Sequence, residues 1–120
     1  MGSRLYSIVV GSRAPAQLAR FWAQVLDFRV VFEEPEEVVV ARDDNIYPGF
    51  IFVPVPEAKT KKNRLHIDLA PDDCDSEVAR LIALGTSPVD VGQGPDVSWV
   101  VLADPEGNEF CVLSTREGGL

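Results

Sequence analysis

The chain has 120 residues, 46% of them hydrophobic and 25% charged, which fits one small globular domain and excludes a disordered chain. Eleven basic and nineteen acidic residues give a net charge of −8, so the overall field repels nucleic-acid phosphates and anionic membranes and attracts cationic small molecules. Two cysteines are too few for a disulfide framework, and no apolar run is long enough for a membrane span. We therefore expect a reduced, cytoplasmic protein that works on a small molecule.

The first half of the chain predicts a strand, a helix and three further strands. Leu5–Val10 is short and rich in β-branched residues, as strands are. Apolar residues in Ala16–Leu26 recur at the spacing of one helix face, and Pro15 suits the first turn of that helix. Three strand candidates follow, Phe28–Glu33, Glu37–Arg42 and Gly49–Val55.

The second half repeats this order after a polar connector at residues 56–63. It predicts a strand at Arg64–Ala70, a helix at Asp72–Leu84 and strands near Ser87–Val91, Val97–Ala103 and Asn108–Ser114. Asp72, Asp73 or Asp75 can cap the start of the helix, and Gly85 can end it.

The repeated order indicates a duplicated β-α-β-β-β module of about sixty residues. Leu18-Ala19-Arg20 recurs as Val78-Ala79-Arg80, which supports the duplication. We divide the single α+β domain into modules 4–56 and 64–115. One module is too small for a stable core, so two must pack together, within the chain or between chains. Each mixed sheet then covers its helix with one face and, if it curls, lines a cavity with the other.

Alternation along the strands predicts which side chains face that cavity. In the strand that opens the second module, Leu65, Ile67 and Leu69 should cover the helix, which leaves Arg64, His66 and Asp68 for the cavity. In the first strand, Tyr6, Ile8 and Val10 should cover the helix, which leaves Ser7 and Val9 for the cavity.

Residues 104–108, Asp-Pro-Glu-Gly-Asn, are the clearest turn signal in the chain. The proline fits the second position of a type I turn, and Gly107 can take the left-handed position. With this turn, Val101 lies opposite Cys111 and Trp99 lies opposite Leu113, so that these four residues share one face of the sheet.

Several of these motifs together resemble the vicinal oxygen chelate superfamily, and most of all its small glyoxalase-like or bleomycin-resistance-like proteins. The resemblance rests on the doubled element order and on four segments, Leu18–Trp22, Leu26–Phe28, Leu65–Leu69 and Asp104–Phe110. It implies two curled sheets around a cavity and a homodimer. It also implies a divalent metal held by His, Gln or Glu side chains from symmetry-related strands.

The implied metal ligands are mostly missing from this chain. The corresponding positions fall on Ser7, His66 and Cys111, and the fourth lies in Gly49–Val55, which offers no strong side-chain donor. A functional site needs three or four converging donors. Asp68 is a spare carboxylate on the His66 face, but the resulting set is unusual. We therefore expect no metal and no other cofactor.

Three functions stay open at this level. The first is a small-molecule binding protein that works without a metal and holds an aromatic or cationic ligand. The ligand-binding candidates are Ser7, Tyr47, Phe52, His66, Asp68, Trp99 and Cys111. The second is a lyase, isomerase or dioxygenase-like enzyme in which His66, the only histidine, is the acid/base or a metal ligand. The third is a module that docks another protein through a sheet edge.

Two candidate residues each have a functional and a structural interpretation. His66 is a catalytic residue in the second function, and in the first it is simply a histidine hydrogen-bonded in a polar cavity. Cys111 becomes a nucleophile if His66 lowers its pKa, and otherwise it fills space in a strand as a small buried side chain.

Overall fold

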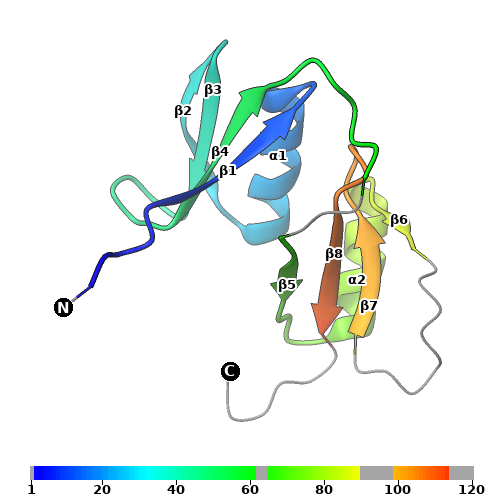
Figure 1. The fold of residues 1–120 in the computed structure, drawn as a ribbon. Coiled ribbons are helices and arrows are strands. Elements are labelled where there is room, and N and C mark those ends of the chain that lie inside the picture. The colour runs from blue at the N-terminus through cyan, green and yellow to red at the C-terminus, as the bar shows by residue number, and fades with distance from the viewer. Residues whose placement is uncertain (1, 62–64, 90–98, 114–120) are drawn as a thin grey trace. The chain divides into compact units, whose positions relative to one another are not determined.

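The computed structural model describes residues 2–61, 65–89 and 99–113 (Figure 1). The chain divides into two compact units, Met1–Ala58 and Lys59–Leu120, which we call module 1 and module 2. No helix among the described residues has the length and apolar character needed to cross a membrane.

Module 1 is a four-stranded mixed sheet with one helix. Its elements are β1 (Ser7–Ser12), α1 (Pro15–Leu26), β2 (Arg29–Glu34), β3 (Glu37–Ala41) and β4 (Gly49–Pro54). The strand order is β1-β4-β3-β2, in which β1 runs parallel to β4 and the other pairs are antiparallel.

Module 2 repeats this arrangement. Its elements are β5 (Ile67–Leu69), α2 (Cys74–Leu84), β6 (Ser87–Pro88), β7 (Trp99–Ala103) and β8 (Glu109–Leu113). The strand order β5-β8-β7-β6, again with a parallel first pair, matches that of module 1 position by position. The predicted α+β class and the doubled β-α-β-β-β order are confirmed.

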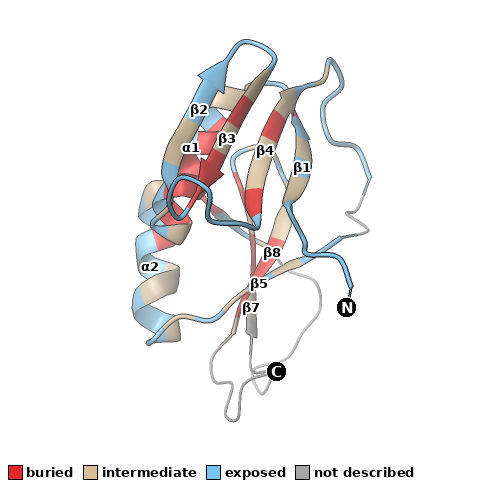
Figure 2. Ribbon diagram, turned by 90° about the vertical axis from the view of Figure 1, so that its left-hand side faces the viewer, coloured by how far each residue is buried: buried red, intermediate tan, exposed pale blue. Residues whose placement is uncertain are grey.

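Helix α1 forms the core of module 1 with one face of the sheet. Pro15 is its first residue, where a missing N–H costs nothing, and Asp27 ends it in the left-handed conformation. Its apolar face is buried, and the ring of Trp22 contacts that of Phe50 edge-on at 6.3 Å. Figure 2 shows buried residues gathered on α1, β3 and β4. Each large apolar side chain buried here contributes roughly 1.5–3 kcal/mol of transfer free energy.

Helix α2 begins and ends with residues that the sequence predicts as its caps. Asp73, one of three candidate caps, accepts a hydrogen bond from the backbone N–H of Ser76 at 3.1 Å. Gly85 ends the helix with φ at 118°, a conformation that glycine adopts without strain.

The hairpin of β7 and β8 has the predicted register, with Val101 opposite Cys111 and Trp99 opposite Leu113. The carboxylate of Asp104 holds the turn, because its Oδ1 accepts hydrogen bonds from the backbone N–H groups of Glu106 and Asn108, both at 2.9 Å. Gly107 has φ at 86°, in the left-handed region, as expected.

Two predicted strands begin later than expected, which corrects the faces assigned to their first residues. Leu65 lies before the first paired residue of β5 and is 78% exposed, so it does not cover α2. Tyr6 likewise precedes β1 and is 68% exposed, so it does not cover α1. Arg64, Val91, Val97 and Ser114, which we placed in strands, lie outside the described residues.

Candidate functional site

Module 1 contains a cavity of about 670 Å³ on the sheet face that points away from α1. Val39, Ala41, Gly49 and Ile51 form its floor, and these alternate along β3 and β4 with the buried, helix-facing residues. The loop at residues 43–47 forms part of its wall. We call this space the tyrosine cavity, after Tyr6 and Tyr47, which both line it.

The two tyrosines form an aromatic corner at the cavity. Their ring centroids lie 5.3 Å apart with the planes tilted by 52°. The guanidinium carbon of Arg4 lies over the ring of Tyr47, 5.1 Å from its centroid, which is a cation–π contact. The ring of Tyr47 therefore already holds a cation from the protein itself.

The lining of the tyrosine cavity is also acidic. Glu37, Asp43 and Asp44 all contribute to it. Asp43 forms an exposed ion pair with Arg29, its Oδ1 lying 2.6 Å from Nη1, and so ties the loop to β2. The three carboxylates outnumber the two arginines described beside them, Arg29 and Arg4, so the wall keeps a net negative charge that attracts cations.

Of the three ligand-binding candidates in module 1, the structure places two at the tyrosine cavity and one in the core. Ser7 and Tyr47 both line the tyrosine cavity, whereas Phe52 does not. Phe52 is fully buried and its ring packs edge-on against Phe50, which contacts α1 through Trp22, so its assignment to a cavity wall is wrong. The continuous apolar run of β4 hides this, because no alternation of polar and apolar residues marks which face of the strand meets α1.

The sequence alone did not identify Tyr6, Glu37, Asp43 or Asp44 as residues that line a binding site. The predicted strand began at Leu5, whereas β1 begins at Ser7. Tyr6 therefore lies outside the strand, and the alternation of strand faces does not apply to it. Asp43 and Asp44 lie between two predicted strands, where polar residues are typical of a turn. Their position in a polar loop beside an aromatic residue was the available signal for a binding wall.

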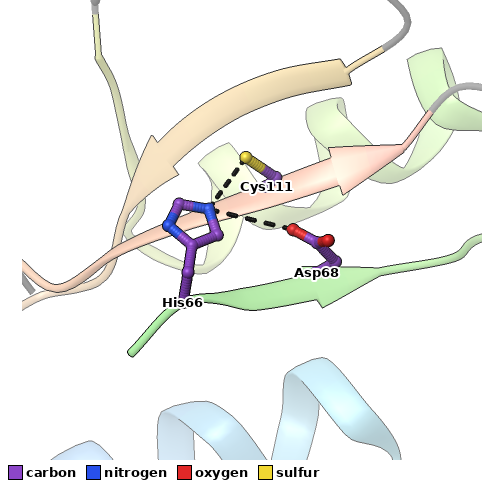
Figure 3. Close-up of side chains that lie close together, drawn as sticks. All are labelled: His66, Asp68 and Cys111. Atoms are coloured by element: carbon purple, nitrogen blue, oxygen red, sulfur yellow. Dashed lines mark hydrogen bonds and ion pairs between the residues drawn. The ribbon is translucent and has the colours of Figure 1, made fainter. Parts of the chain in front are cut away.

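In module 2, His66, Asp68 and Cys111 lie together (Figure 3). The imidazole Nε2 of His66 lies 2.9 Å from Sγ of Cys111 and 3.8 Å from Oδ1 of Asp68. Asp68 and Cys111 are directly paired across β5 and β8, and His66 stands two residues before Asp68. Alternation predicts a common face for His66 and Asp68, and the pairing of β5 with β8 brings Cys111 to the same place. We call the three the His66 cluster.

Cys111 is not an activated nucleophile. Burial raises the pKa of its thiol, and the negative charges of Asp68 and Glu109 raise it further. The thiol is thus protonated at neutral pH and weakly nucleophilic. This contradicts the alternative in which His66 lowers the pKa of Cys111.

The His66 cluster also lacks the geometry of a proton relay. In a relay, a carboxylate holds one ring nitrogen while the other nitrogen faces the reacting group. Here the thiol and the carboxylate approach the same nitrogen (Figure 3), and Asp68 is beyond hydrogen-bond distance from it. Asp68 therefore does not orient the imidazole for acid–base chemistry.

The remaining candidate, Trp99, lies in β7 at the predicted register position, and its side chain is outside the described part of the chain, as is Arg64.

A divalent metal does not fit the donor set that the family resemblance implies. The implied positions supply a hydroxyl from Ser7, an imidazole and a thiol, and Gly49–Pro54 supplies no metal-binding side chain. The His66 cluster does fit, because its imidazole, carboxylate and thiol atoms all lie within 4.8 Å of one another. Asp68, the spare carboxylate on the His66 face, is the third donor of this set.

Comparison with solved structures gives the same fold over nearly the whole chain. A glyoxalase/bleomycin resistance protein/dioxygenase family enzyme from Burkholderia phytofirmans matches with a TM-score of 0.74 at 18% identity, covering 95% of this chain and 100% of the other. The transposon Tn5 bleomycin resistance determinant matches with a TM-score of 0.62 at 18% identity, covering 95% and 99%.

A third similar structure is the fosfomycin resistance protein FosX from Mesorhizobium loti. It matches with a TM-score of 0.66 at 17% identity, covering 97% of this chain and 93% of the other. At these identities the likeness concerns the fold.

No curated protein sequence matches the chain significantly. The family model for the glyoxalase-like domain, in contrast, matches residues 7–113. Together with the doubled module and the mixed sheets, this match confirms the resemblance stated from the sequence: the chain belongs to the glyoxalase-like domain family, with the glyoxalase/bleomycin resistance fold.

Proposed function

We propose that this protein binds a small cationic aromatic molecule in the tyrosine cavity. The observation that carries the proposal is the guanidinium of Arg4 over Tyr47, beside a wall that contains Glu37, Asp43 and Asp44. A cation from the chain itself occupies the position that a cationic ligand would take.

The physical chemistry of the cavity favours such a ligand in two ways. A cation over a tyrosine ring gains roughly 0.5–2 kcal/mol, depending on how far it is desolvated. The aromatic part of the ligand packs on apolar floor residues such as Val39 and Ile51. A volume of about 670 Å³ lies within the range usual for small-molecule sites. Two structural neighbours are named for resistance to bleomycin and fosfomycin, which is consistent with small-molecule binding.

A matched pair of probes tests the proposal by isothermal titration calorimetry. Benzyltrimethylammonium carries the aromatic ring with a positive charge, and benzyl alcohol carries the ring without it. We expect the cation to bind at least tenfold more tightly than the alcohol. Equal affinities, or no binding of either probe, would contradict the proposal.

Substitutions locate the binding to this cavity. Tyr47→Leu removes the aromatic face and should weaken binding of the cation by about five- to thirtyfold, the equivalent of roughly 1–2 kcal/mol. Asp44→Asn should weaken it less. Glu57→Gln is the control for Asp44→Asn, because it changes the net charge equally at an exposed residue outside the cavity lining. If Glu57→Gln weakened binding as much as Asp44→Asn, the effect would belong to the overall charge and not to the cavity wall.

A further inference from the structure

Residues 2–6, which precede β1, reach the tyrosine cavity, and we call them the Arg4 segment. They join no helix or strand, and all five are exposed. At one end of the segment, the carbonyl oxygen of Tyr6 accepts a hydrogen bond from the backbone N–H of Gly49 at 3.0 Å. At the other end, a side-chain carbon added to Gly2 would meet no atom within 4 Å. The segment is thus anchored at Tyr6 and open to solvent at Gly2.

Between these two points, the segment contacts Tyr47 through its side chains. The ring of Tyr6 lies 5.3 Å from that of Tyr47, and the guanidinium carbon of Arg4 lies 5.1 Å from the centroid of the Tyr47 ring. In Figure 1 the segment before β1 passes beside the loop between β3 and β4, which carries Tyr47. Among the described residues, no carboxylate forms an ion pair with Arg4. The cation of Arg4 is therefore held by the ring.

We propose that Arg4 is an internal competitor for the tyrosine cavity: a cationic ligand binds there by displacing the Arg4 guanidinium from the ring of Tyr47. This inference rests on the cation binding proposed above for the same cavity, and it adds how that binding is controlled. Two cations do not share one ring face at close range, because they repel each other and both need the negative potential of the ring. The free protein is thus a self-occupied form, and the ligand opens it.

The contact of Arg4 is weak enough to be displaced. An exposed cation–π contact of ordinary strength favours the docked arginine over the undocked one by about two- to fivefold. The ring is then free in roughly one third to one sixth of the molecules, and the apparent affinity for a cationic ligand falls by the same fraction. Removal of the Arg4 side chain should therefore raise that affinity by about three- to sixfold.

The two arginines beside the acidic wall differ in how firmly they are held. Arg29 belongs to β2 and forms an ion pair with Asp43, with 2.6 Å between its Nη1 and the carboxylate Oδ1. Arg4 belongs to no strand and has the ring contact instead. A ligand cation therefore displaces Arg4 and leaves Arg29 in place. The negative charge that Arg4 had balanced then becomes available to the ligand.

Nuclear magnetic resonance tests the docking and the displacement directly. In the free protein, the ring current of Tyr47 should shift the side-chain protons of Arg4 upfield, and Tyr47→Leu should remove this shift. Saturation of the wild-type protein with benzyltrimethylammonium should return these protons to the positions seen in Tyr47→Leu. Arg4 protons that keep their upfield shift in the saturated complex would overturn the proposal, as would the absence of the shift in the free protein.

Isothermal titration calorimetry with the same probe measures the competition. Arg4→Gln should tighten binding by about three- to sixfold, because it removes the competing cation. Arg42→Gln is the matched control, since it removes the same charge at an exposed residue next to Asp43 that does not line the cavity. It should change the affinity by less than about twofold. Circular dichroism establishes that both variants are folded.

The outcomes separate this proposal from the function on which it rests. Weaker binding by Arg4→Gln would mean that Arg4 assists the ligand, and equal gains in Arg4→Gln and Arg42→Gln would reduce the effect to overall charge. Either result overturns the competition while cation binding in the cavity stands. If neither the wild type nor Arg4→Gln binds the probe, cation binding itself fails, and the competition fails with it.

Discussion

Among single residues, Phe52 and Tyr47 show how differently two aromatic side chains of one module are used. Phe52 points toward α1, has no exposed surface and packs against Phe50. Tyr47 is 36% exposed and carries the cation of Arg4. The first residue therefore serves the stability of module 1, and the second serves the surface that the tyrosine cavity presents to a ligand.

Phe52→Ala should lower the free energy of unfolding by about 3–5 kcal/mol, because it removes a buried ring and leaves a cavity. Urea denaturation followed by circular dichroism measures this. Tyr47→Leu, at a partly exposed position, should change the same free energy by less than about 1 kcal/mol. Similar costs for the two substitutions would contradict the assignment of Phe52 to the core and Tyr47 to the cavity wall.

Among the elements, the start of α2 depends on a charged cap. Hydrogen bonds from the side chain and backbone of Ser76 hold the pKa of Asp73 below its usual value of 3.8. Asp73 is thus a stronger acid in the folded protein than in the unfolded chain. The stabilisation that it gives is fully present above the unfolded pKa and is lost as the pH falls through the folded pKa.

Asp73→Ala should lower the melting temperature at pH 7, because the N–H groups of the first turn lose their acceptor. The difference from the wild type should shrink as the pH falls below about 4. Thermal unfolding at pH 7, 5, 4 and 3 measures the trend. Asp72→Ala is the control, because it removes a neighbouring carboxylate that is not the cap residue. A difference that grew on acidification would contradict the capping role.

At the scale of the whole molecule, several apolar side chains of the described residues lie largely in solvent. Leu5, Val9 and Leu65 are 60%, 59% and 78% exposed. A module of one helix and four short strands also buries little apolar surface by itself. Both observations favour association between copies of the chain.

We therefore expect a homodimer in solution. Light scattering coupled to size-exclusion chromatography should give a mass of about twice 13.1 kDa at micromolar concentrations. The apparent mass should fall on dilution, since dimerisation depends on concentration. A mass of one chain over the whole concentration range would contradict the expectation.

Much of the architecture was predictable because its signals are local. Proline at the start of α1, glycine at the end of α2 and the Asp104–Asn108 turn act through neighbouring residues only. The turn also set the register of β7 against β8, since a hairpin loop fixes which residues lie opposite each other. Alternation in Leu65–Leu69 then placed His66 and Asp68 on one face.

The sequence by itself therefore determined the element order, the duplicated modules, the family resemblance and the shared face of His66 and Asp68. Tertiary structure alone decided where β1 and β5 begin, which corrected Tyr6 and Leu65, and which way the uniformly apolar β4 turns Phe52. It also decided that the carboxylate and the thiol meet at one nitrogen of His66 and that the loop at residues 43–47 closes an acidic wall around Tyr47. These features depend on distances between segments far apart in the chain, and local periodicity and turn chemistry do not encode such distances.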